Sequence, residues 1–237
     1  MTLTIIIPVL NEAEHLTALL PSLVANHPDA ELIVTDGGSA DASQAVVART
    51  PSARWLDAPR GRARQMNAAA GLATGDALLF LHADTRLPPG AAAAIAAALA
   101  DPQVIAGRFD VRLDSPRPLL RVVEAMMNAR SRLTGICTGD QALFIRRAAF
   151  DAVGGYPDIP LMEDIALSRR LKRRGRVTAL RLRVTTSARK WEREGVVRTI
   201  LLMWALRLAY AVGVAPARLH RWYYGRDPAP PAVPSAR

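Results

Sequence analysis

The chain has 237 residues, half of them hydrophobic, which is enough for one sizeable α/β core without a second full domain. Its net charge of +10 is uneven, because residues 1–100 carry 6 Lys and Arg against 9 Asp and Glu, whereas residues 101–237 carry 25 against 12. No helix-turn-helix, zinc-finger or aromatic RNA-binding pattern accompanies the basic half, so we exclude nucleic acid and retain an anionic membrane surface, a phosphorylated substrate or a solvated basic surface.

The first hundred residues alternate short apolar runs with helical patterns, which predicts βα units on a mostly parallel sheet. Asp41 is placed to cap one helix, and Pro88, Pro89 and Gly90 open another that is rich in alanine. We expect strands at 3–9, 31–35, 54–57 and 77–81. We expect helices around 16–24, from Asp41 through Ala48, at 62–72, and from Gly90 to about Ala100.

The second half predicts further strands and helices of more varied kind. Residues 104–113 alternate apolar and polar side chains like a strand with one exposed face, so the sheet is expected to be mixed. We then expect a helix at 118–133, a strand at 142–146, a break at Gly154 and Gly155, and a helix at 164–174 that Gly175 ends.

The segment at 196–214 is strongly apolar but contains Arg198 and Arg207, which fall on opposite sides of a helix. Two arginines at the membrane centre would cost several kcal/mol, so packing or shallow membrane docking is expected rather than a membrane span. We divide the chain into an α/β domain at 1–195, an apolar helical segment at 196–226 and a disordered, proline-rich tail at 227–237.

The cellular compartment follows from two features. Cys137 is the single cysteine and permits no internal disulfide, which fits a reducing compartment. The N-terminus runs into the first strand without a basic leader or a cleavage site. We therefore expect a cytoplasmic protein, peripheral at the inner face of the membrane if the apolar segment docks there.

Polar loops follow the predicted strands, where a parallel sheet of this kind holds its ligands. In IIIPVLNE and TDGGSADAS, short polar groups can bind a nucleobase or ribose, and the paired glycines let the backbone approach a ligand closely. The candidate residues for binding a nucleotide-sugar donor in these two loops are Pro8, Asn11, Glu12, Asp36 and Gly37. Helix capping by Asn11 is the structural alternative.

Two further acidic segments carry candidate chemistry. In LHADT, the carboxylate of Asp84, together with His82, can hold a divalent cation at a diphosphate, unless Asp84 is a turn residue. In LMED, Glu163 and Asp164 stand at a helix start, where negative charge stabilises the helix. The catalytic interpretation is that Asp164 accepts a proton from an acceptor hydroxyl and Glu163 orients it.

Cationic and amide side chains complete the candidate set. Guanidinium groups can pair with phosphate, an aromatic ring beside cations suits a diphosphate with a sugar or lipid, and polar residues before a strand can line an acceptor pocket. The structural alternatives are a solvated basic turn for the guanidinium groups, a stacked surface tryptophan for the aromatic ring, and an ordinary turn for the polar residues before the strand. The residues are Arg60, Arg62 and Arg64 in PRGRARQMN, Arg189, Lys190 and Trp191 in TSARKWEREG, and Asp140 and Gln141 in TGDQALF.

Taken in order, these segments resemble the family 2 glycosyltransferases over roughly residues 3–195. IIIPVLNE is similar to the opening strand of that family, TDGGSADAS to its nucleotide loop, HAD to its Asp-x-Asp metal motif and MED to its Glu-Asp base motif. GRARQMNAAAG, PLMEDIALSRRLKRRG and TSARKWEREG resemble more specifically a bacterial subgroup associated with arsenosugar biosynthesis.

The resemblance implies a GT-A nucleotide-diphospho-sugar transferase fold, in which helices flank a mostly parallel mixed sheet, here with a C-terminal apolar helix. It implies that Glu12 and Asp36 contact the nucleoside of a UDP- or GDP-sugar, Asp84 binds Mg²⁺ or Mn²⁺, and Asp164 is the base of an inverting transfer to a hydroxyl. Arg189 to Trp191 would occupy the place of the family's Gln-x-x-Arg-Trp motif.

Two departures from the family pattern affect these expectations. His82 replaces the first Asp of the metal motif, and the stretch from Ser187 to Trp191 lacks the Gln and has Lys before Trp. Both put metal affinity and processive synthesis in doubt. A single transfer to a small or lipid-linked acceptor is therefore expected, since the chain also lacks the several membrane helices of polysaccharide synthases.

Three other functions fit parts of the pattern. A nucleotidyltransferase would share the sheet and the metal, but its Gly-rich, Arg-containing loop after the first strand is missing. A non-catalytic protein would bind the nucleotide-sugar without turnover. A membrane-surface transferase acting on a polyprenyl phosphate fits the basic C-terminal half and the apolar segment.

Overall fold

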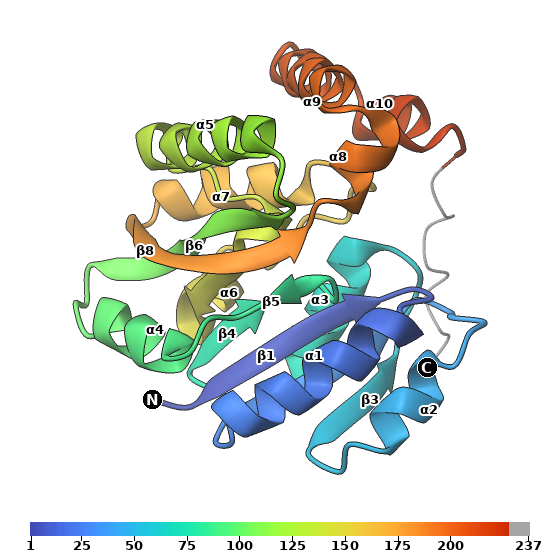
Figure 1. The fold of residues 1–237 in the computed structure, drawn as a ribbon. Coiled ribbons are helices and arrows are strands. Elements are labelled where there is room, and N and C mark those ends of the chain that lie inside the picture. The colour runs from blue at the N-terminus through green and yellow to red at the C-terminus, as the bar shows by residue number, and fades with distance from the viewer. Residues whose placement is uncertain (228–237) are drawn as a thin grey trace, which may run out of the picture.

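The structure, a computed structural model, describes residues 1–227, so the predicted disordered tail lies outside the described residues except for Asp227. Eight strands form one sheet in the order β3-β2-β1-β4-β7-β6-β8-β5, with helices on both of its faces (Figure 1). The strands β1 to β4 are parallel, whereas β7 runs antiparallel between β4 and β6. The predicted mixed α/β sheet is confirmed.

The elements alternate along the chain much as the periodicities predict. The strands are β1 Leu3–Val9, β2 Glu31–Asp36, β3 Ala53–Asp57, β4 Ala77–Phe80, β5 Thr85–Arg86, β6 Val104–Asp114, β7 Leu143–Arg146 and β8 Arg176–Ser187. The helices are α1 Ala13–Asn26, α2 Ser43–Ala48, α3 Arg62–Leu72, α4 Ala91–Leu99, α5 Pro118–Thr134, α6 Arg147–Ala152, α7 Glu163–Lys172, α8 Arg189–Glu194, α9 Val196–Ala211 and α10 Pro216–Tyr224, with a short 3₁₀ helix, η1, at Gly139–Gln141.

The central strand β1 is buried on both faces of the sheet. Because successive side chains of a strand point to opposite faces, Ile5 and Ile7 join one core, with α1 and α4, while Ile6 joins the other, with α3, α6 and α7. All three isoleucines have no exposed surface. Burial of each side chain stabilises the fold by about 1.5–3 kcal/mol. Because both faces of the strand are covered, its sequence is a continuous apolar run rather than an alternating one.

The prediction that one face of the 104–113 strand is exposed is wrong over most of the strand's length. Arg108 and Asp110, the polar side chains that define this face, are only 1% and 9% exposed. Helix α5 covers them: Arg108 pairs with Asp110 and donates to the carbonyl of Asn128 at 3.0 Å, and Arg132 binds Asp110 at 2.5 Å. The alternation is real, but its polar half forms a covered ion-pair network.

Five strands and α-helices were not predicted from the sequence, namely β5, α6, β8, α8 and α10, and neither was the 3₁₀ helix η1. The expected helix at 196–214 also ends early, because α9 stops at Ala211 and Gly213, at a φ of 91°, turns the chain. Pro216 then starts α10. Among residues 1–227, no helix combines the length and the apolar character that crossing a membrane requires.

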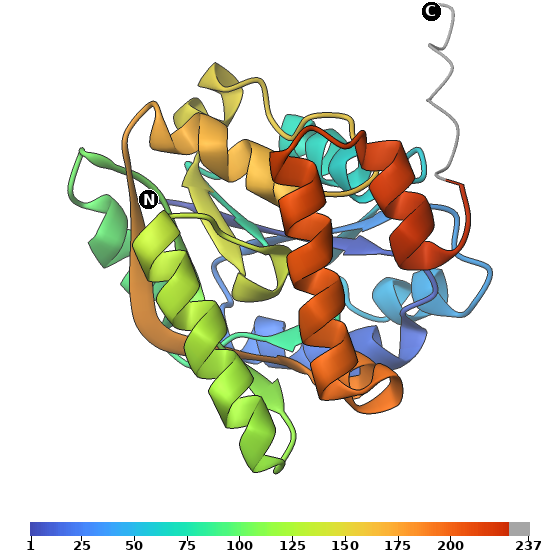
Figure 2. The same cartoon turned by 90° about the horizontal axis from the view of Figure 1, so that it is seen from above.

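Helices α5, α9 and α10 lie together above the sheet in Figure 1, and all three face the viewer when the molecule is seen from above (Figure 2). Leu206 of α9 packs in one buried cluster with Met162 and Ile165, at the start of α7. Leu219 of α10 belongs to the same cluster. The C-terminal helices are therefore built onto the segment that contains Glu163 and Asp164.

Candidate active site

The loops after β1 and β2 are bound to each other at one edge of the sheet. Asn11, at a positive φ of 58°, accepts a hydrogen bond from the amide of Ala40 at 2.8 Å through its side-chain oxygen. The amide of Asn11 donates in turn to Ser39 Oγ at 2.8 Å, and the amide of Glu12 donates to Ser43 Oγ at 3.0 Å. Asn11 therefore links the loops rather than capping α1, whose N-cap residue is Glu12.

The carboxylate of Asp36 organises the second loop. It accepts the amide protons of Gly38 at 2.9 Å and Ser39 at 2.8 Å. Pro8, another predicted donor-binding residue, lies within β1 and is half-buried. The two loops together form a fixed polar rim at the carboxyl ends of β1 and β2, the place where a doubly wound sheet binds nucleotides.

Gln65 of α3 supports this rim, although the sequence analysis gave it no role. Its side-chain amide donates to the carbonyls of Val9 at 2.7 Å and Thr35 at 2.8 Å, so it joins the ends of both strands. A Cβ at Gly37 would come within 3.0 Å of Gln65 Oε1. A larger residue at position 37 would therefore require Gln65 to shift beneath the loop. A lone glutamine within an otherwise amphipathic helix carries no sequence signal of this kind.

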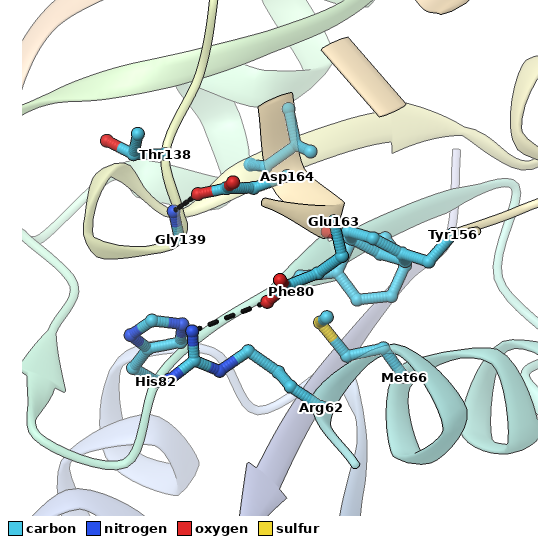
Figure 3. A pocket seen from close by; sticks show the side chains of 10 residues that line it. Arg62, Met66, Phe80, His82, Thr138, Gly139, Tyr156, Glu163 and Asp164 are labelled. Atoms are coloured by element: carbon cyan, nitrogen blue, oxygen red, sulfur yellow. Dashed lines mark hydrogen bonds and ion pairs between the residues drawn. The ribbon is translucent and has the colours of Figure 1, made fainter. Parts of the chain in front are cut away.

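A cavity lies beside the rim, between β4, α3, η1 and the start of α7 (Figure 3). Its lining residues are Arg62, Met66, Phe80, His82, Thr138, Gly139, Leu143, Tyr156, Glu163 and Asp164. Within it, Asp164 accepts the amide proton of Gly139 at 3.1 Å and that of Ile165 at 2.7 Å. The structure thus brings together His82, Glu163 and Asp164, three residues that the sequence analysis selected from two distant segments.

The two carboxylates of this cavity have different electrostatic surroundings. Glu163 is buried and forms an ion pair with Arg62 at 3.4 Å, shown by a dashed line in Figure 3. Burial and the neighbouring charge of Glu163 raise the pKa of Asp164 to about 6, against the opposing effect of Arg62. A carboxylate with such a pKa is ionised at neutral pH and still basic enough to accept a proton.

His82 is held neutral in the same cavity. Burial, and secondarily the charge of Arg62, lower the pKa of His82 to about 3. A Cβ at Gly139 would lie 2.4 Å from His82 Nε2, so only glycine fits between this ring and the backbone that binds Asp164. Gly139 therefore positions both side chains at once.

The arginines of PRGRARQMN divide between three environments. Arg62 reaches the cavity, whereas Arg60 is exposed on the surface. Arg64 binds Asp158, in the loop before α7, at 2.7 Å and also donates to the carbonyl of Arg60 at 3.3 Å. The sequence analysis grouped the three as equivalent phosphate ligands, but Arg60 precedes α3, and Arg62 and Arg64 make different contacts from its first turn.

Asp84 lies outside the cavity lining, on the loop between β4 and β5. Its carbonyl accepts the amide proton of Ser187 at 3.2 Å, and its carboxylate accepts one hydrogen bond, from Thr85 Oγ1 at 3.3 Å. Pairing of β5 with the end of β8 brings the segment of Arg189 to this loop. In the described part of the chain, no three His, Cys, Asp or Glu side chains are grouped as a preformed metal site.

The residues of the Arg-Lys-Trp stretch point to three different places. Arg189 contacts His15 Nε2 at 3.3 Å, and His15 Nδ1 bonds the carboxylate of Glu12 at 2.7 Å. Lys190 pairs with Glu194 at 3.0 Å and lies 4.1 Å from the centre of the Tyr223 ring. Trp191 packs on a buried cluster formed by β6, α5 and α9. Arg189 is thus the member of the stretch that adjoins the first loop.

Asp140 and Gln141 have separate environments in η1. Gln141 is fully buried, and its side-chain oxygen accepts the amide proton of Thr138 at 3.2 Å, so it caps η1. Asp140 has one buried carboxylate oxygen without a hydrogen-bond partner among residues 1–227, and it acts electrostatically on Arg130 and Arg207. Those two arginines, from α5 and α9, also feel the charge of Asp164, and the sequence analysis assigned no role to either in this site.

Comparison with known proteins identifies the family and the fold of the chain. A family model described as glycosyl transferase family 2 matches residues 4–152. No curated protein sequence matches the chain significantly. Among solved structures, residues 1–349 of TarS from S. aureus match with a TM-score of 0.66 and 18% identity, over 79% of this chain and 61% of that one. The chain thus spans about three fifths of the length of that structure.

Two other similar structures hold nucleotide ligands. A mannosyltransferase from Pyrobaculum calidifontis in complex with GDP-Man and Mn²⁺ matches with a TM-score of 0.67 and 24% identity, over 97% of this chain and 66% of that one. A glucosyl-3-phosphoglycerate synthase from Mycobacterium tuberculosis with Mg²⁺ and UDP matches with a TM-score of 0.59 and 16% identity, over 77% and 69%. These likenesses show the GT-A type of fold, and the family model covers more than half of the chain. The chain belongs to glycosyl transferase family 2.

Proposed function

We propose that this protein is an inverting glycosyltransferase, which moves a sugar from a nucleoside diphosphate donor to an acceptor hydroxyl. The observation that carries the proposal is the half-buried carboxylate of Asp164, with a pKa of about 6, at the cavity beside the polar rim. Asp164 takes the hydroxyl proton, the acceptor oxygen bonds to the anomeric carbon, and the bond from that carbon to the diphosphate breaks. Attack opposite the leaving group inverts the configuration.

The donor is assigned to the polar rim. Glu12 and Asp36 contact the nucleoside in this proposal, and Arg189 contacts the diphosphate. The bond from His15 to Glu12 and the contact of His15 with Arg189 support it, because they connect the two proposed contacts through one imidazole. The similar structures include complexes of S. aureus TarS with UDP-GlcNAc and of the P. calidifontis mannosyltransferase with GDP-Man, which supports a UDP- or GDP-sugar.

Mg²⁺ or Mn²⁺ fits Asp84 in this proposal. Its carboxylate accepts one long hydrogen bond, so several lone pairs are left, and Mg²⁺ characteristically takes one or two carboxylates with the rest of its ligands from phosphate and water. The predicted second ligand, His82, lies beside the positive charge of Arg62, which disfavours a cation at that ring. When bound, the ion supplies neutralisation of diphosphate charge.

The acceptor and the cellular role are the finer parts of the proposal. A small or lipid-linked hydroxyl compound is the acceptor class, and the subgroup resemblance supports a role in arsenosugar biosynthesis. We place the enzyme in the cytoplasm, with residues 1–195 as the catalytic domain and residues 196–226 as a helical segment that packs on it or on a membrane. The contacts of α9 and α10 with the start of α7 support the packing of this segment on the domain.

The first experiment is nucleoside diphosphate release by the purified protein from UDP-, GDP- and dTDP-sugars, with Mn²⁺ or Mg²⁺. Release from one donor that requires an acceptor would support the transferase and identify the donor. Pyrophosphate release from a nucleoside triphosphate and a sugar phosphate would support a nucleotidyltransferase instead. Donor binding without turnover, across acceptors that include polyprenyl phosphate, would favour a binding protein.

The transfer rate is expected to depend on pH through Asp164. Because the base must be ionised and its pKa is raised to about 6, kcat/KM should fall by about tenfold per pH unit below that value and level off above it. A pH profile of initial rates measures this. A flat profile between pH 5 and pH 7, in a protein that remains folded by circular dichroism, would exclude Asp164 as the base.

Two neighbours of Asp164 should move this profile in opposite directions. Glu163 raises the pKa of Asp164 and Arg62 lowers it. We therefore expect Glu163→Gln to shift the acid limb to lower pH and Arg62→Gln to shift it to higher pH. The same assay measures both variants. Shifts of the two variants in the same direction would mean that the acid limb of the profile reflects the titration of a group other than Asp164.

A further inference from the structure

Exposed apolar side chains gather on one part of the molecule. Among residues 1–227, all but three of the large apolar side chains that face solvent lie on α5, on α9 and its C-cap, and on α10. They are Leu119, Val122, Met126 and Leu133 on α5, Val197, Leu201, Trp204, Leu208 and Val212 on or next to α9, and Trp222 and Tyr224 on α10. We call these residues the apolar face.

Helix α9 is apolar on two opposite sides. Steps of four, three and four residues separate the exposed members from Val197 to Leu208, which aligns them along one side of a helix of 3.6 residues per turn. Leu206, which is 1% exposed, points to the other side and packs above α7. Trp204 and Leu208 are 61% and 68% exposed. Packing on the domain accounts for only one of these two apolar sides, because a surface helix usually has a single apolar stripe that faces the core.

The three helices share one side of the molecule, as both views of the fold show (Figures 1 and 2). The charges of α9 and α10 have one sign, because residues 196–224 contain Arg198, Arg207, Arg218 and Arg221 and no Asp or Glu. Helix α5 contains one carboxylate, Glu124, which is buried. Arg198 and Arg218 are exposed and have no carboxylate within 4.0 Å among residues 1–227. A surface with these features complements an anionic partner that also accepts apolar side chains.

We propose that the apolar face docks on an anionic lipid bilayer, with α5, α9 and α10 lying in the interface and not crossing it. Trp204 and Trp222 suit the boundary between headgroups and acyl chains, and the exposed Arg198 and Arg218 suit anionic headgroups. Pairing of this face with a second copy is disfavoured, because it would bring like charges of α9 and α10 together.

Docking places the membrane close to the proposed base, a consequence that rests on the proposed function. Leu206 contacts the cluster of Met162 and Ile165 on the inner side of α9, while Trp204 and Leu208 face outward. The bilayer surface therefore lies about one helix diameter, roughly 10 Å, from the segment that carries Asp164. Arg130 and Arg207 lie near Asp164 from α5 and α9. This arrangement fits an acceptor whose headgroup is anchored in the bilayer.

The test is flotation of the full chain with vesicles of phosphatidylcholine, alone or mixed with phosphatidylglycerol. We expect binding to the mixed vesicles, weaker at high salt, and at least a tenfold loss in the double variant Trp204→Glu and Leu208→Glu. The matched control, Leu72→Glu with Leu182→Glu, changes two exposed apolar side chains elsewhere by the same charge and should bind like the unmodified protein.

Three outcomes would overturn the docking proposal. They are absence of binding to mixed vesicles, equal binding by the two double variants, and a dimer in light scattering that only the α9 variant abolishes. Circular dichroism and nucleotide binding verify that each variant folds. Flotation needs no donor and the release assay needs no vesicle, so failure of docking and failure of the transferase proposal are separate results.

Discussion

Asp164→Asn is expected to lower kcat by about 10³-fold and to leave the dissociation constant of the donor nearly unchanged. The amide cannot accept the hydroxyl proton, and the proposed donor contacts are residues of the rim and Arg189 rather than Asp164. Both carboxylate oxygens accept backbone N–H groups, from Gly139 and Ile165, so the amide must lose one of these bonds. Removal of a charge that burial and Glu163 disfavour opposes the loss of this bond, so the thermal stability should change little.

The measurement is a set of initial rates with saturating donor, together with donor titration by calorimetry and a thermal melt. Asp151→Asn is the matched control, because Asp151 is an exposed carboxylate on α6 that pairs with Arg147 outside the cavity. It should retain full activity. If Asp164→Asn keeps more than about a tenth of the rate, general base catalysis by this residue is wrong.

Asp84→Ala is expected to weaken metal-dependent donor binding by about 100-fold or more, since even the loss of an outer partner of a metal ligand costs 10–100-fold in affinity. The variant should bind the donor equally weakly with and without Mn²⁺. Loss of the carboxylate leaves the carbonyl that binds Ser187 in place, so the pairing of β5 with β8 persists.

Donor titration by calorimetry, with Mn²⁺ present or chelated, measures the effect. Asp29→Ala, in the exposed turn before β2, removes the same charge far from the loop of Asp84 and should behave like the unmodified protein. If the Asp84→Ala variant still binds the donor more tightly with Mn²⁺ than without it, a residue other than Asp84 is the metal ligand.

The first half of the fold could be predicted because its information is local. Strand β1 matches its expected bounds, and β2 and β4 differ from theirs by one residue, since each is a short apolar run bounded by polar breakers. The second half is less local. Strand β8 was missed because Arg181 and Arg183 interrupt its apolar pattern where the strand faces solvent, and α10 was missed because Leu219 is its single buried residue.

The candidate site divides in the same way. Asp36, Asp84 and Asp164 belong to short motifs with a recognisable residue order. Asp36 ends β2, Asp84 immediately precedes β5, and Asp164 lies in the first turn of α7. Gln65 and Arg62 acquire their contacts by packing of α3 against loops distant in sequence. A contact of this type has no local pattern, because it is set by the angle between a helix and the sheet.

The antiparallel insertion of β7 between β4 and β6 has a consequence for synthesis of the chain on the ribosome. Strand β4 is complete at Phe80, yet the strand that covers its open edge begins only at Leu143. During that interval an apolar strand edge is unpaired, which is the condition under which nascent chains associate with one another or are held by chaperones. The donor loops can thus form early on the ribosome, while a soluble product requires the emergence of β7.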